Sequence, residues 1–210
     1  LARSTYYARR ELPDRWGLAP VTAFYADTPG ISWAVVAPFA QAGIRYLMHC
    51  RGGWRGEGRT AMPDIFYWQA PNGKDRLLYH GRWGYTDPLL DLLTGGYNRL
   101  REQIETYLRQ HDNAPYDALC APCYQDHELP NVTALETVQS WRSQWAYPDI
   151  RLSLYRDYFA HMEERYADRL PTLSGDINDS WGDYAAIDPT AMGQKRNAAA
   201  ALSLCSRVVL

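Results

Sequence analysis

Three aspartates lie where the sequence predicts that strands give way to loops, and carboxylates in such positions can carry out chemistry. They are Asp27, Asp126 and Asp176. Hydrolysis of a glycosidic bond uses two carboxylates, one that attacks or stabilises the cationic sugar and one that donates a proton to the leaving oxygen. Asp27 and Asp126 are far apart in the sequence, but the ends of adjacent strands can bring such residues together. The alternative is that Asp27 merely caps a helix or satisfies a turn.

Histidines near the acids would also suit a metal site. His127 directly follows Asp126 and can serve the same site. For the other histidines we expect places in the core or on the surface; they are His49, His80, His111 and His161. Because no H-E-x-x-H or comparable local spacing is present, a metal site would have to be assembled from distant segments.

Cys120 and Cys123 form a C-x-x-C motif, a pattern that can serve redox chemistry or bind zinc. A redox motif of this kind opens a helix directly after a strand, whereas residues 124–130 here are predicted to be a loop. No second cysteine pair stands at zinc-finger spacing. With Cys50 and Cys205, the four cysteines are also too few and too scattered for a disulfide scaffold.

The element that must position Asp27 is a strand–turn–helix–strand unit. Residues 21–26 are apolar and rich in strand formers, and Pro29-Gly30 marks a turn after them. Ser32 is a suitable N-cap for a helix over residues 33–42, and Gly43 suits a left-handed exit before a second strand at 44–49. Asp27 therefore falls at the carboxyl end of a strand, where parallel α/β folds place ligands and catalytic groups.

Strand and helix patterns alternate through the rest of the chain. Asn72-Gly73 predicts a hairpin between strands at 64–70 and 75–80. Gly95-Gly96 is expected to break a helical pattern over 89–110. Further on we expect strands at 116–121 and 150–154, helices at 133–145 and 156–168, and an extended piece at 170–176. Repeated βα units predict an α/β fold with a mostly parallel sheet and outer helices.

The composition is that of a soluble globular protein. The 210 residues carry a net charge of −2, which gives no reason to expect nucleic acid or an anionic membrane as a partner. No apolar run approaches the length needed to span a bilayer, and a cytoplasmic location is favoured. The 16 Tyr and 8 Trp against 4 Phe suit a carbohydrate partner, because these rings stack and also hydrogen-bond; alternatively they fill the core. The oligomeric state is left open.

Three blocks of sequence resemble the amino-terminal catalytic domain of glycoside hydrolase family 38, the retaining α-mannosidases, and in particular its divergent bacterial-type members. The first block, residues 26–47, looks like the family's D-x-P-G segment and the strand after it. The second, residues 65–73, is similar to an F-W-W-x-x-P-D-G hairpin. The third, residues 170–176 with 181–184 and 195–197, is similar to the segment that leads into the family's helical bundle.

This resemblance implies a seven-stranded β/α barrel of which the chain would be the greater part. It divides the chain into an incomplete barrel domain at 1–186 and the start of a helical region at 187–210, so that we expect a fragment of a longer protein. Asp27 falls on the position of the nucleophile, which in the family also binds a divalent metal, zinc, and Asp126 falls on the acid/base. Trp33, Trp68 and His127 are the expected carbohydrate-binding residues.

The chain departs from the family pattern in several places. The family's first-strand His-x-Asp metal pair would lie before Leu1, and a later metal histidine after Leu210. Ile31 stands where the family often has histidine, and Tyr124-Gln125 replaces the Gly-Asp before the second acid. Two alternatives to a metal-assisted α-mannosidase therefore stay open: another metal-dependent carbohydrate enzyme such as a deacetylase, and a catalytically silent carbohydrate-binding homologue.

Overall fold

A computed structural model describes residues 5–28, 30–51, 62–83, 87–111, 115–122, 129, 131–177 and 189–208. The strands are β1 (Thr22–Thr28), β2 (Tyr46–Arg51), β3 (Ile65–Gln69), β4 (Arg76–Trp83) and β5 (Thr172–Leu173). The helices are α1 (Leu12–Trp16), α2 (Val36–Gln41), α3 (Pro88–Thr94), α4 (Tyr97–Gln110), α5 (Val132–Gln144), α6 (Tyr155–Tyr166) and α8 (Pro189–Val208). A π-helical turn, Tyr7–Glu11, precedes α1, and 3₁₀ turns, Trp33–Val35 and Ala167–Arg169, adjoin α2 and α6.

The described strands form one five-stranded sheet with the order β1-β2-β4-β3-β5. The pairs β1–β2, β2–β4 and β3–β5 are parallel, whereas β3 and β4 pair in antiparallel fashion. The antiparallel pair is the predicted hairpin: Gly73 has φ of 66°, and the Asn72 side chain accepts hydrogen bonds from the backbone N–H groups of Lys74 and Asp75. The α/β class and the hairpin are confirmed, and β1, β2 and β4 share one carboxyl edge.

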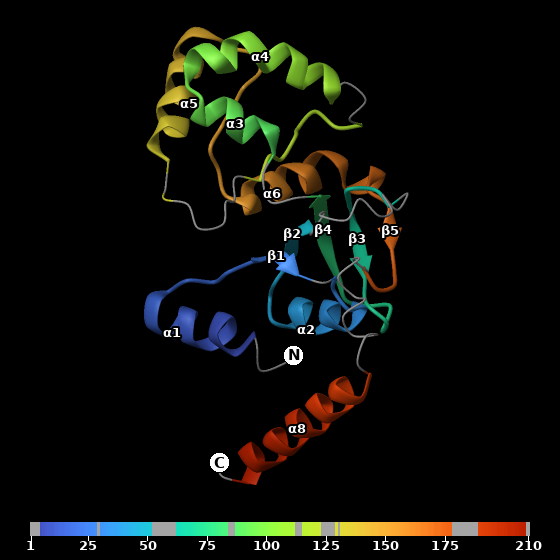
Figure 1. Cartoon of the computed structure of the whole chain (residues 1–210). Helices are drawn as coiled ribbons and strands as arrows, with labels where there is room; N and C mark the ends of the chain where they lie inside the picture. Colours follow the sequence, from blue (N-terminus) through green and yellow to red (C-terminus); the bar gives the residue numbers. More distant parts are fainter. Residues whose placement is uncertain are drawn as a thin grey trace.

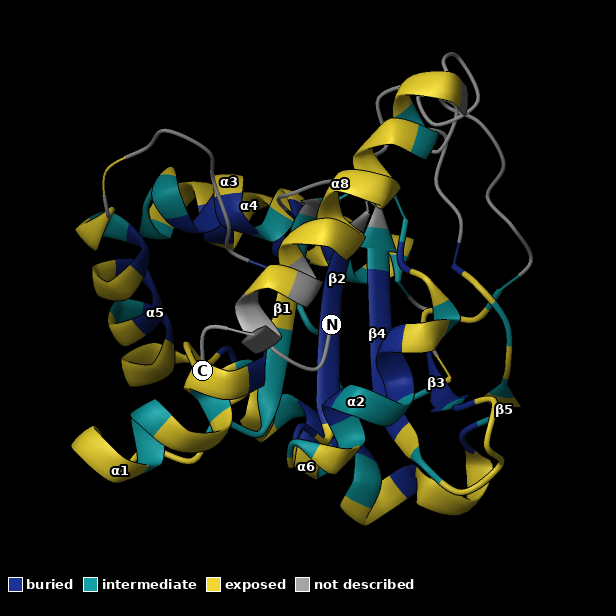
Figure 2. Ribbon diagram, turned by 90° about the horizontal axis from the view of Figure 1, so that it is seen from below, coloured by how far each residue is buried: buried dark blue, intermediate teal, exposed yellow. Residues whose placement is uncertain are grey.

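Helices cover both faces of the sheet. In Figure 1, α2 lies on one face and α6 on the other, while α3, α4 and α5 form a further layer beyond α6. Figure 2 shows that β2 is buried and that β4 is buried over residues 77–81, whereas β1 at the edge is only partly covered. The core on the α2 face includes Val36, Phe39, Leu47, Phe66, Trp68 and Tyr79. The core on the α6 face includes Tyr46, Met48, Leu78, Phe159 and Met162.

The unit predicted around Asp27 is confirmed in its main features. The Ser32 hydroxyl accepts a hydrogen bond from the backbone N–H of Ala34 at 3.3 Å and so caps the turn that opens α2. Gly43 leaves the helix with φ of 85°, a conformation in which a side chain would be strained. The chain then enters β2 beside β1, with Thr22 opposite Tyr46.

The helices α3, α4 and α5 pack around a core of their own, which includes Leu93, Leu100, Ile104, Val138 and Trp141. The predicted break at Gly95-Gly96 is confirmed, since α3 ends at Thr94 and Gly96 has φ of 88° directly before α4. Asn131 caps α5 through its side chain, which accepts from the backbone N–H of Thr133 at 2.9 Å.

Two predicted strands are wrong: residues 116–121 and residues 150–154 belong to no strand of the described sheet. Tyr116, Ala118 and Cys120 pack on the α6-side core, which explains the strand-like alternation of apolar residues. The backbone N–H of Asp117 donates to the Tyr166 hydroxyl at 3.1 Å instead of to a neighbouring strand. The alternation of apolar residues therefore predicted correctly which side chains are buried, but it did not predict the partner of the backbone hydrogen bonds.

The described part of the chain does not form a closed seven-stranded barrel. Ile31 and Ile177, which follow the edge strands β1 and β5, exchange backbone hydrogen bonds of 2.7 and 3.0 Å. The predicted domain boundary between residues 186 and 187 lies outside the described residues and stays a prediction. Among the helices that the structure describes, none combines the length and apolar character needed to cross a membrane.

Candidate active site

Asp27 is the next-to-last residue of β1, at the carboxyl edge that β1 shares with β2 and β4. The register with β2 shifts at this point: Ala26 is opposite Cys50, and Thr28 is opposite Arg51, so Asp27 is the extra residue of a bulge. Bulges of this kind re-aim a side chain and are frequent beside active sites. The backbone of Asp27 is thus placed where the sequence predicted, while its side chain lies outside what the structure describes.

A buried row of polar side chains joins the three parallel strands next to Asp27. The Thr28 hydroxyl of β1 lies 3.1 Å from Nε2 of His49 on β2, and Nδ1 of His49 lies 2.9 Å from the Tyr79 hydroxyl on β4. His49 has no exposed surface. Its expected place in the core is confirmed, but sequence reasoning missed that it links Thr28 to Tyr79.

At the end of β4, Arg82 forms an ion pair with Asp87, which is completely buried. Asp87 also caps α3, because its Oδ1 accepts from the backbone N–H of Leu89 at 2.8 Å and Pro88 occupies the first helical position. Sequence reasoning missed this residue as well, although the Asp-Pro pair before an apolar helix is a recognisable start signal.

The same ion pair anchors the segment that leads toward Asp126. An Nη atom of Arg82 donates to the carbonyl oxygen of Cys120 at 3.3 Å, and the backbone N–H of Asp87 donates to the carbonyl oxygen of Pro122 at 3.3 Å. Cys120 and Pro122 are therefore attached to the carboxyl end of β4.

Asp126 and His127 themselves lie outside the described residues. The ends of β1 and β4 are separated by two strand spacings, or about 10 Å. The chain from Pro122 to Asp126 can extend about 13 Å, at roughly 3.3 Å per residue. That Asp126 lies close to Asp27 stays a prediction.

Burial also decides which nucleophiles this edge can supply. Removal from water raises the pKa of the Cys50 thiol to about 11, although the nearby Arg82 guanidinium acts in the opposite direction. Burial likewise raises the pKa of Tyr158, whose ring packs on His80 with centroids 5.3 Å apart. Both groups keep their protons at neutral pH, so Cys50 is not suited to nucleophilic attack.

Two of the predicted carbohydrate-binding residues are described, and they differ. Trp33 is half-buried; its indole N–H donates to the Gln69 carbonyl at 2.5 Å, and its backbone N–H donates to the Asp176 carboxylate at 2.6 Å. Trp68 is 1% exposed, and its indole N–H donates to the Gly175 carbonyl at 2.9 Å. Trp68 is a core residue here, so the expectation that it contacts a sugar is corrected: no ring face is open to a ligand.

The Trp33 contact also gives Asp176 a role different from that of Asp27. Asp176 is exposed and accepts from the first backbone N–H of the turn that opens α2, which is the position of an N-terminal cap. The acid that the sequence placed at a third strand end therefore caps a helix that lies far from it in the sequence.

The described residues do not by themselves make a metal site. Among them, no group of three histidine, cysteine, aspartate or glutamate side chains is arranged to hold an ion. Both ring nitrogens of His49 already lie within hydrogen-bond distance of hydroxyl groups. Asp27 is thus one candidate ligand, and a protein site for zinc needs at least three.

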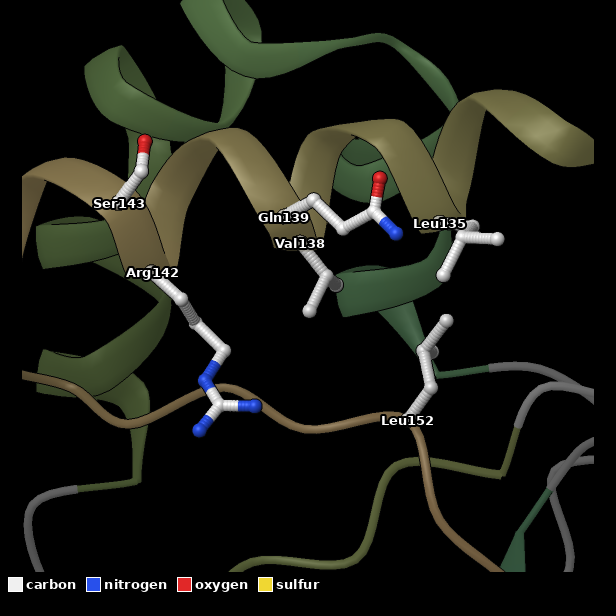
Figure 3. A pocket seen from close by; sticks show the side chains of 6 residues that line it. All are labelled: Leu135, Val138, Gln139, Arg142, Ser143 and Leu152. Carbon is white, nitrogen blue, oxygen red and sulfur yellow. The ribbon is translucent and has the colours of Figure 1, made fainter.

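A groove of about 450 Å³ lies away from this edge, between α5 and residues 150–154 (Figure 3). Leu135, Val138, Gln139, Arg142, Ser143 and Leu152 line it. Because this lining contains no carboxylate, histidine or cysteine, the groove offers no acid, base or nucleophile for catalysis.

Comparison with known families gives a match over most of the chain. The sequence profile of the glycosyl hydrolases family 38 N-terminal domain matches residues 1–176, which include β1 to β5 and helices α1 to α6. The corresponding comparison with curated individual proteins gave no match.

Proposed function

Because the chain belongs to the glycosyl hydrolase family 38 N-terminal domain family, we propose that it contributes the catalytic centre of a retaining glycosidase that acts on α-mannosides or related glycosides. The observation that carries this proposal is the place of Asp27, in a bulge at the shared carboxyl end of parallel strands. Such an edge is where α/β folds gather catalytic groups from different strands.

In the proposed reaction, the Asp27 carboxylate attacks the anomeric carbon while the bond to the leaving oxygen breaks and Asp126 gives that oxygen its proton. A glycosyl ester on Asp27 results. Water then attacks the anomeric carbon, Asp126 takes the proton from the water, and the ester bond to Asp27 breaks. Two displacements at one carbon retain the configuration of the sugar. Trp33 and His127 are proposed to contact the sugar, and we also propose that the sheet is part of a seven-stranded barrel.

The roles of the two acids can be separated by chemical rescue. With an aryl α-mannoside that has a good leaving group, Asp27→Ala should lose at least a thousandfold in turnover, and azide should restore activity by forming the β-glycosyl azide. In Asp126→Ala, azide should instead give the α-glycosyl azide, because the nucleophile is intact. Asp176→Asn is the matched control: it keeps the capping oxygen, and its turnover should stay within twofold of the parent protein. Full activity in Asp27→Ala would refute the assignment.

We further propose Asp27 as one ligand of a divalent metal, with zinc as the candidate. The ion would polarise substrate hydroxyls and favour the charged form of the carboxylate. Elemental analysis tests this directly: about one zinc per chain in the parent protein and loss of zinc in Asp27→Asn is the expected result.

Two other functions are tested by the same preparation. A metal-dependent deacetylase would release acetate from acetylated sugars and leave aryl glycosides intact. A silent carbohydrate-binding homologue would show heat of binding with mannosides in calorimetry but no product.

A further inference from the structure

The hydrogen-bonded row Thr28–His49–Tyr79 has no part in the proposed reaction, yet it lies directly beside Asp27. It crosses the three parallel strands from β1 through β2 to β4, with spacings of 3.1 and 2.9 Å. A neutral imidazole has one N–H and one acceptor nitrogen, so His49 can bond both hydroxyl groups in either tautomer. Both hydrogen bonds of the row can therefore form while His49 is neutral.

The inner end of this row is fixed by the core. The Tyr79 ring packs against Phe66 at 4.8 Å and against Trp68 at 5.7 Å between centroids. It also lies over Gly81: a Cβ at that position would overlap the Tyr79 side chain. Glycine at position 81 thus allows the tyrosine to lie along β4 and to reach His49, and close packing leaves the ring no alternative place.

The outer end of the row holds the residue after the bulge. Thr28 resumes the pairing of β1 with β2, opposite Arg51, so the position of Thr28 determines where the bulge closes. A bulge lacks one set of ladder hydrogen bonds and is held less firmly than regular strand. The hydrogen bond between Thr28 and the buried His49 therefore restrains the strand at Asp27, where backbone pairing with β2 is interrupted.

We propose that His49 is a positioning residue, which together with Tyr79 holds the bulge so that Asp27 is presented in one orientation. This inference rests on the proposed function for its catalytic consequence, but the structural constraint can be measured without any substrate. Because a displacement of about 1 Å in a reacting group can cost on the order of 100-fold in rate, loss of the row should lower kcat and leave KM nearly unchanged.

Tyr79→Phe is the most conservative test, since it removes one hydroxyl and keeps the ring. Tyr46→Phe is the matched control: Tyr46 is a buried tyrosine at the amino end of β2, and its hydroxyl donates to Glu163 at 2.7 Å. Each variant loses one buried tyrosine hydroxyl group from the same sheet. We expect kcat to fall about 10- to 100-fold in Tyr79→Phe, with KM changed less than threefold, and to stay unchanged in Tyr46→Phe.

Amide hydrogen exchange supplies the readout that does not depend on activity. Exchange at residues 26–28 should quicken at least tenfold in Tyr79→Phe and remain at the parent rate in Tyr46→Phe. If Tyr79→Phe does not fold, Thr28→Val, which removes the hydroxyl at the outer end, serves in its place with the same expectations.

Equal kcat values in the two tyrosine variants, or unchanged exchange at residues 26–28, would overturn the positioning role. If the parent protein hydrolyses no glycoside, the proposed function fails on that result alone. The exchange data then decide this inference by themselves: faster exchange in Tyr79→Phe supports the constraint, and identical exchange refutes it.

Discussion

Replacement of Asp87 by asparagine should destabilise the protein by about 3 kcal/mol, because it leaves the partly buried Arg82 without its counter-charge. Asp87 has no exposed surface, and the Arg82 side chain is 24% exposed. Asparagine is as good an N-cap as aspartate, so the hydrogen bond from Leu89 can persist and the measured loss belongs to the ion pair. Asp87→Ala removes the cap as well and should lose about 1 kcal/mol more.

The assay is urea unfolding, with the midpoint and the slope fitted separately. Arg82→Met leaves a buried carboxylate unpaired and should lose about 3–5 kcal/mol, whereas the double variant Arg82→Met/Asp87→Asn removes both charges and should recover part of that loss. Asp149→Asn is the control: its pair with Arg151 has 42% and 67% exposed side chains, and such pairs contribute about 0–1 kcal/mol.

A local readout connects this pair to the candidate site. Arg82 donates to the Cys120 carbonyl and the backbone N–H of Asp87 donates to the Pro122 carbonyl, so loss of the ion pair in Asp87→Asn should also speed amide exchange over residues 118–122. A loss no larger than that of Asp149→Asn would refute the conclusion that the pair anchors this segment. A loss in the double variant equal to the sum of the two single losses would show that the two charges are not coupled.

Gly81→Ala should cost about 1–3 kcal/mol in urea unfolding, because its methyl group overlaps the Tyr79 side chain; a neutral result would mean that the tyrosine has another place to go. For Asp117, hydrogen bonding and charge from α6 hold the pKa of the carboxyl below its usual range. Because its pKa is lowered by folding, the ionised carboxyl stabilises the folded protein at pH values above the unfolded-state pKa of about 3.9, and this stabilisation is lost as the pH falls through the folded-state pKa. Asp117→Asn should therefore be less stable than the parent protein at pH 7 and equally stable near pH 2. A difference in stability that persists at pH 2 would contradict this. A thiol reagent added to the folded protein should modify the exposed Cys205 and leave Cys50 unreacted until denaturant is added. Cys50 is protected because it is buried and because its pKa is raised to about 11. Rapid labelling of Cys50 in the folded protein would contradict its burial.

Much of the candidate site is local in origin and could be predicted from the sequence. The strand that carries Asp27, the Ser32 cap and the left-handed Gly43 follow from patterns that act over a few residues. The hairpin at Asn72-Gly73 and the break at Gly95-Gly96 are of the same kind. In each case the backbone conformation that the residue favours is also the one that the fold needs.

Other features depend on which segments meet, and only the tertiary structure decided them. Tyr116, Ala118 and Cys120 alternate like a strand, but their partner is the α6-side core and not a neighbouring strand. Trp68 resembles a sugar-binding aromatic residue in the sequence, yet the core on the α2 face buries it. Asp176 stands at a predicted strand end like a catalytic acid, but its carboxylate accepts a hydrogen bond from the backbone N–H of Trp33 and so caps the turn that opens α2.

The same distinction applies to His49 and Asp87, the two residues that the sequence did not single out. A lone buried histidine and an aspartate before proline are ordinary features of a chain. Their roles arise because parallel pairing places His49 between Thr28 and Tyr79, and because Arg82 at the end of β4 meets both Asp87 and Cys120. The sequence by itself therefore determined where a candidate acid stands on its strand, and long-range packing determined what holds that strand end in place.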